Sequence, residues 1–99
     1  MNFTKSSEEI LRLHLRCKEY GIRLQELALL CLVRSGKMVR LTGVAGLLGV
    51  SSGAVTMLAR KLERRGLAKR VPSAADLRRV YLELTDDGKE AVRLLAGEE

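Results

Sequence analysis

Residues 41–88 place two short helical patterns on either side of a tight turn, and two strand patterns follow them. Gly49 can end the first helix, and Ser51 or Ser52 can cap the second by accepting a hydrogen bond from a free backbone N–H. This order of elements is typical of a winged helix-turn-helix. The region therefore predicts a mainly α fold with a small β-hairpin wing.

The second helix of this motif separates apolar side chains from polar ones. Val55, Leu58 and Leu62 recur at the spacing of one helix face, so we expect them to face the core. The opposite face carries Ser52, Gly53, Thr56, Met57, Arg60 and Lys61. Small residues let a backbone approach base pairs closely, and cations one turn later can contact phosphates. This pattern favours binding to duplex DNA.

The expected wing hairpin covers residues 67–84. Val80, Leu82 and Leu84 occupy alternate positions, which is the period of a strand with one buried face. Gly66 is expected to end the preceding helix in the left-handed conformation. The loop over residues 72–78 is too long for a two-residue turn, and we expect it to form the wing.

Positive charge is concentrated in the same region. The chain has a net charge of +6 at pH 7, and residues 51–85 hold eight basic and three acidic side chains. A basic chain favours nucleic acid as a partner, and an anionic membrane second. A run of about 18 apolar residues and a signal peptide are both missing, so we expect a cytoplasmic protein that does not bind membranes.

Residues 1–21 predict a helix with more apolar surface than docking onto one domain requires. The sequence SSEE at residues 6–9 predicts a capping box, and Gly21 is expected to end the helix. Its apolar residues form two stripes, and the second stripe favours a second copy of the chain as a partner. The expected homodimer interface comprises Ile10, Leu13, Cys17, Tyr20, Val92 and Leu95.

The remaining segments complete a single domain over residues 1–99. Residues 24–33 predict a central buried helix, and residues 38–41 a short strand. Thr42 is expected to cap the first motif helix, and Thr85 to cap a short last helix within residues 85–99. The expected core face of the first motif helix is Val44, Ala45, Leu47 and Leu48.

Other kinds of chemistry lack the residues they need. Cys17 and Cys31 are too few for a disulfide scaffold, although a redox role for Cys17 stays open. His14 and Cys17 supply two potential metal ligands where a zinc site usually needs three or four. We therefore expect no metal, no cofactor and, without a nucleophile or a phosphate-binding loop, no enzyme.

Five short motifs together resemble the MarR family of bacterial transcription regulators. They are LLGVS at residues 47–51, AVT at 54–56, LERRGLAKR at 62–70, DLR at 76–78 and LELTDDG at 82–88. The resemblance extends over residues 20–95, and the combination is more specific than any one motif. Typical members continue into long dimerisation helices after the wing, so we expect a short form of the family.

The resemblance implies a homodimeric regulator that binds duplex DNA and acts by occupying an operator, most simply as a repressor. Ser52, Gly53, Thr56 and Met57 would lie against base edges. Arg78 would enter the minor groove, with Asp76 holding its guanidinium. The expected DNA-binding residues are Thr42, Ser51, Ser52, Gly53, Thr56, Met57, Arg60, Lys61, Lys69, Arg70, Asp76, Arg78 and Arg79. Any small-molecule effector stays unknown.

Two other functions fit the same pattern. An architectural or segregation protein would bind DNA without controlling a promoter, and a winged helix can also serve as a protein-interaction module.

Overall fold

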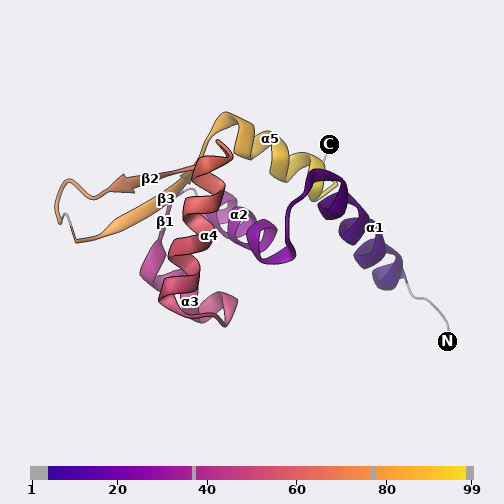
Figure 1. Ribbon diagram of the computed structural model, residues 1–99, viewed down its shortest axis with the longest axis horizontal. Helices are drawn as coiled ribbons and strands as arrows, with labels where there is room; N and C mark the ends of the chain where they lie inside the picture. The colour runs from indigo at the N-terminus through magenta and orange to yellow at the C-terminus, as the bar shows by residue number, and fades with distance from the viewer. Residues whose placement is uncertain (1–4, 37, 77, 98–99) are drawn as a thin grey trace.

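The computed structural model describes residues 5–36, 38–76 and 78–97 of the chain. Within these residues it holds five helices and a three-stranded sheet (Figure 1). The elements are α1 (Lys5–Tyr20), α2 (Leu24–Gly36), β1 (Met38–Arg40), α3 (Leu41–Leu48), α4 (Ser52–Arg64), β2 (Ala68–Pro72), β3 (Val80–Leu84) and α5 (Asp86–Leu95). The predicted winged helix-turn-helix fold is confirmed. In the described ranges no single helix has the length and apolarity to span a membrane, although the bent pair α3 and α4 meets both criteria jointly.

The core lies between α2, α4, α5 and one face of the sheet, and α2 supplies much of it. The most deeply buried side chains are Leu29, Leu30, Val33, Val44, Val55, Ala59, Leu62, Leu82, Val92 and Leu95. On α4 the predicted face is buried at Val55 and Leu62, while Leu58 packs partly against it. The apolar periodicity of α4 therefore gave the correct orientation of the helix.

The expected core face of α3 was partly wrong. Val44 is fully buried and Leu48 packs against the core, but the Leu47 side chain is 72% exposed. One residue turns an α-helix by about 100°, so Leu41, Val44 and Leu48 fall within one sector and Leu47 lies beside it. Because α3 is short and lies at the edge of the domain, the core covers only this sector of the helix and leaves Leu47 exposed.

The sheet has the order β1-β3-β2, with both neighbours antiparallel to β3. Arg40 pairs with Tyr81 across one edge of β3, and Arg70 pairs with Leu82 across the other. The hairpin of β2 and β3 extends away from the helices in Figure 1. The predicted strand over residues 38–41 is present, but Leu41 already belongs to α3 because β1 runs into that helix without a linker.

Two of the predicted helix caps are confirmed. The Ser51 hydroxyl accepts a hydrogen bond from Ala54 N at 3.1 Å, and the Thr85 hydroxyl accepts one from Gly88 N at 3.0 Å. Thr85 also donates to the Gly66 carbonyl at 2.6 Å. These bonds satisfy backbone groups that a helix end leaves free.

The other two predicted caps are wrong. Thr42 lies inside the first turn of α3, and the capping position belongs to Arg40, which makes no side-chain cap bond. Ser6 lies inside α1, because this helix has already begun at Lys5. In both cases the helix has already begun before the serine or threonine whose hydroxyl would favour it as the capping residue.

Gly88 allows the start of α5 to pack directly against the turn between α4 and β2. A Cβ atom at this position would overlap the carbonyl group of Leu67. The same carbonyl accepts a hydrogen bond from Thr85 N at 3.2 Å. The glycine therefore serves a close backbone approach rather than an unusual backbone angle.

Candidate nucleic-acid interface

The outward face of α4 is the first part of the candidate interface. Exposed on it are Ser52, Gly53, Met57, Arg60 and Lys61, as predicted. Thr56 is half-buried, and its hydroxyl donates to the Ser52 carbonyl of its own helix at 3.1 Å. The face therefore offers a short polar stretch, one exposed thioether and two cations. Thr42 is also exposed, on α3, whereas the hydroxyl of Ser51 is engaged as the cap of α4.

Arg64 extends this face, although the sequence reasoning did not include it. Gly53, Met57, Arg60 and Arg64 recur at steps of three and four residues, so they share one stripe of α4. Arg60 and Arg64 are exposed and form no ion pair with any residue that the structure describes. The four-residue spacing between Arg60 and Arg64 was enough to predict that the two side chains lie on the same face of the helix.

Lys61 lies on the flank of α4 that faces α2. Its Nζ atom is 3.5 Å from Oε1 of Glu26, whose side chain is almost fully buried. The second carboxylate oxygen of Glu26 accepts a hydrogen bond from Arg23 N at 3.3 Å. The sequence reasoning missed Glu26, although one acidic residue in the apolar run 24–33 signals a buried partner.

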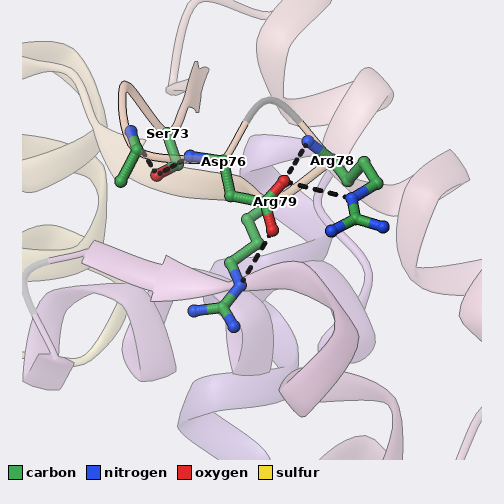
Figure 2. A network of polar contacts seen from close by, with 5 residues as sticks. Ser73, Asp76, Arg78 and Arg79 are labelled. Carbon is green, nitrogen blue, oxygen red and sulfur yellow. Dashed lines mark hydrogen bonds and ion pairs between the residues drawn. The ribbon is translucent and has the colours of Figure 1, made fainter.

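The wing loop is ordered by hydrogen bonds between near neighbours in the sequence (Figure 2). The Ser73 hydroxyl accepts from the backbone N–H groups of Ala75 and Asp76, both at 3.2 Å. The backbone N–H of Ser73 donates to the Arg79 carbonyl at 3.0 Å, and Arg79 N donates to the Asp76 carbonyl at 2.9 Å. These bonds fix the loop on the end of the hairpin. The contribution of Ser73 was not foreseen.

Asp76 positions two arginine side chains. Its Oδ1 accepts from the backbone N–H of Arg78 at 3.0 Å and from the Nε of Arg78 at 3.2 Å. Its Oδ2 lies 3.6 Å from the Nε of Arg79. Figure 2 shows the carboxylate between the two side chains, with the terminal amino groups of Arg78 directed away. The Arg78 side chain is 92% exposed, so its orientation is set while its terminal donors stay open.

Lys69 and Arg70 on β2 are both engaged in ion pairs. The Lys69 ammonium is 3.2 Å from Glu83 on β3. Arg70 donates its backbone N–H and its Nε to the carboxylate of Glu63, at 3.1 and 3.2 Å. The backbone hydrogen bond first, and then the side-chain bond, lower the pKa of Glu63 below its ordinary value. The Arg70–Glu63 pair attaches the hairpin to the end of α4, whereas the Lys69–Glu83 pair joins the two strands of the hairpin.

The expected dimer residues separate into two groups. Ile10 is 67% exposed and Tyr20 is 40% exposed, whereas Leu13 packs partly against the core. Val92 and Leu95 are fully buried within the monomer and Cys17 nearly so. Their place in a dimer surface is therefore corrected, because α5 uses its apolar face to cover α2. Leu11 and Leu15, each more than half exposed, supply the apolar surface of α1 instead.

The environment of Cys17 does not favour a reactive thiol. Burial raises the pKa of this thiol above its ordinary value, so less of it is thiolate near neutral pH. Cys17 and Cys31 are not joined by a disulfide. Among the residues that the structure describes, no three His, Cys, Asp or Glu side chains gather into a possible metal site.

Comparison with known proteins relates this geometry to regulators of transcription. The sequence profile of the family described as transcriptional regulator SarA/Rot matches residues 13–95. A comparison of the sequence with curated proteins gives no match.

Several solved structures share the fold. A mutant of MepR from S. aureus bound to an oligodeoxyribonucleotide has a TM-score of 0.87 at 23% identity, covering 97% of this chain and 76% of that one. YusO from Bacillus subtilis has a TM-score of 0.82 at 22% identity, with 91% and 64% covered. A mutant of MarR from E. coli complexed with operator DNA has a TM-score of 0.80 at 22% identity, with 93% and 66% covered. The chain thus spans about two thirds of the length of YusO and of MarR.

Proposed function

The chain belongs to the SarA/Rot family of transcriptional regulators, and from this premise we propose that it binds duplex DNA sequence-specifically as a homodimer. The observation that carries the proposal is the wing, where Asp76 orients an arginine side chain that is 92% exposed. An oriented guanidinium loses little entropy when it enters a groove of strong negative potential. The wing is thus suited to the minor groove.

The exposed stripe of α4 is the proposed reader of base edges. Gly53 lets the helix approach the major groove closely, and Met57 can contact a thymine methyl group. Arg60 and Arg64 follow on the same stripe, where they can contact phosphates on one side of the groove. The Lys61 ammonium already pairs with the Glu26 carboxylate, and this negative charge offsets part of the attraction between Lys61 and a phosphate.

The second copy of the chain is proposed to bind along α1. This helix exposes Ile10 on one stripe, and Leu11 and Leu15 form a row of large apolar side chains on another. Covering such a row with an identical helix buries apolar area on both copies. Two linked domains can then read two half-sites about one helical turn apart.

We propose further that the protein represses transcription by occupying an operator in the cytoplasm. The MarR structure complexed with operator DNA supports this proposal by analogy of fold. The proposed activity needs only reversible binding, and we assign the chain no catalytic step.

Selection from a random pool of duplex DNA tests the proposal, with elution at rising salt and sequencing of the retained molecules. We expect a palindrome with half-sites about one helical turn apart. Retention of unselected DNA that is lost at moderate salt would instead indicate an architectural or segregation protein. Failure to retain DNA at any salt concentration would indicate a protein-interaction module.

A further inference from the structure

Arg65 makes contacts that its position in a cationic segment does not suggest. It follows α4 directly, and its Nη1 donates to the carbonyl of Gly21 at 2.7 Å. Its Nη2 donates to the carbonyl of Tyr20 at 2.8 Å. The guanidinium therefore joins the end of α4 to the end of α1, between residues more than forty positions apart in the sequence.

These two carbonyls belong to the terminus of α1. The neighbouring carbonyls of Cys17 and Lys18 already accept hydrogen bonds from Ile22 N and Gly21 N. A cation at the carboxyl end of a helix also interacts favourably with the helix dipole. Arg65 thus completes the cap of α1 from a different helix, and its terminal amino groups are not directed at a ligand.

A second contact holds the same junction. Lys61 lies one helical turn before Arg65, on the same flank of α4, and its ammonium pairs with Glu26 at the start of α2. This flank of α4 is therefore bonded to residues 20–26, where the chain passes from α1 to α2. The bonds set the direction in which α1 leaves the domain.

We propose that Arg65 is a positioning residue that fixes the angle between α1 and α4 and so sets the half-site spacing that the dimer accepts. The proposal rests on the proposed function, since it requires a dimer formed through α1. A helix of 16 residues is about 24 Å long, so a rotation of about 10° at its base moves its far end by about 4 Å. One base-pair step is about 3.4 Å. Small changes in this angle are therefore large enough to change the preferred spacing.

The fold itself does not depend on Arg65. Ile22 and Cys17 are buried in the core, and Leu13 packs partly against it, so α1 keeps its apolar contacts without the guanidinium. Loss of Arg65 is expected to widen the range of angles rather than to release the helix.

The test measures affinity for duplexes that carry two identical half-sites, with their separation varied one base pair at a time. We expect the unmodified protein to prefer one separation by about tenfold over separations two base pairs away, and Arg65→Ala to reduce this preference to about threefold or less. Arg65→Lys keeps one donor near the carbonyls and is expected to recover part of the preference. The matched control is Arg64→Ala, which removes the adjacent cation without touching α1 and should weaken all separations alike.

Amide hydrogen exchange of the DNA-free protein gives a second readout. Arg65→Ala should speed exchange at Gly21 and Ile22 by about tenfold, because their bonds lie in the cap that Arg65 completes. An unchanged spacing profile in Arg65→Ala would overturn the role of Arg65 in half-site spacing. Unchanged amide exchange at Gly21 and Ile22 would overturn its role in holding the end of α1. If the unmodified protein binds no duplex or stays monomeric, the proposed function fails and the spacing role falls with it.

Discussion

The wing and α1 lie at opposite ends of a molecule about 52 Å long, and they are held in place by different means (Figure 1). Among the described residues of the wing loop, the ordering hydrogen bonds join residues within the range 73–79. The end of α1 is bonded to Arg65, which is 44 residues away from Gly21. The wing is thus ordered by its own sequence, and α1 is directed by the rest of the domain.

The two regions also expose opposite chemistry. The wing presents an arginine whose orientation is already set, and α1 presents exposed apolar side chains. The first suits an anionic ligand and the second suits a matching apolar surface. Substitutions can therefore disturb both regions together or each one separately.

Gly88→Ala should disturb both regions, and it is the largest effect that we expect. The added methyl group would overlap the Leu67 carbonyl, and backbone cannot move aside as a side chain can. We expect the free energy of unfolding to fall by about 4 kcal/mol in chemical denaturation. The control is Gly46→Ala on α3, where a Cβ meets nothing within 4 Å and should leave stability equal or higher. Equal stability of the two variants would contradict the packing role of Gly88.

Leu15→Glu should disturb α1 alone. In the proposed dimer the partner helix would bury Leu15, and the substitution places a charge in that apolar interface. We expect the dimer to weaken by about 3 kcal/mol, or roughly a hundredfold. Sedimentation at a series of concentrations measures this change. Leu47→Glu is the control, because Leu47 is similarly exposed but lies on α3. A dimer that persists in Leu15→Glu would place the interface elsewhere.

Arg78→Ala should disturb the wing alone. It removes the side chain that Asp76 orients, and specific DNA binding should weaken by about 2 kcal/mol in a titration at fixed salt. Arg93→Ala on α5 also removes a half-buried arginine from an ion pair and should leave affinity close to that of the unmodified protein. Equal losses in both variants would indicate a general charge effect instead of a role for the wing.

The smallest expected effect concerns the attachment of the hairpin to α4. The pKa of Glu63 is lowered in the folded protein, so its carboxylate stabilises the fold above about pH 4.5. This stability is lost as the pH falls through the lowered pKa. The change should stay below about 1 kcal/mol because the pair is partly exposed to solvent. Glu63→Gln should remove this part of the acid dependence, and an identical pH profile in both proteins would contradict the assignment.

The comparison of the wing with α1 also explains which features could be predicted from the sequence. The caps at Ser51 and Thr85 and the wing loop depend on residues a few positions apart, and their patterns were readable. The pairing of Lys61 with Glu26 and the bonds of Arg65 to α1 depend on how the helices pack. Short motifs indicated these local hydrogen bonds, although the caps expected at Ser6 and Thr42 were wrong, whereas contacts between helices depend on the tertiary fold.

The burial of α5 shows the same limit. The sequence shows that this helix has apolar residues, but it does not specify that they cover α2. Val92 and Leu95 therefore joined the predicted dimer surface although they complete the monomer core. Periodicity identifies which face of a helix is apolar, but not which element covers it.

The direct passage from β1 into α3 determines where the chain can change in length. Arg40 is the last residue of the strand and also the residue before the helix, so an inserted residue there would rotate α3 by about 100° relative to the sheet. The buried position of Val44 would then face solvent. A residue inserted beside Ala74 would only enlarge an exposed loop. Related chains are therefore expected to vary in the length of the wing and to keep a constant length at the strand–helix junction.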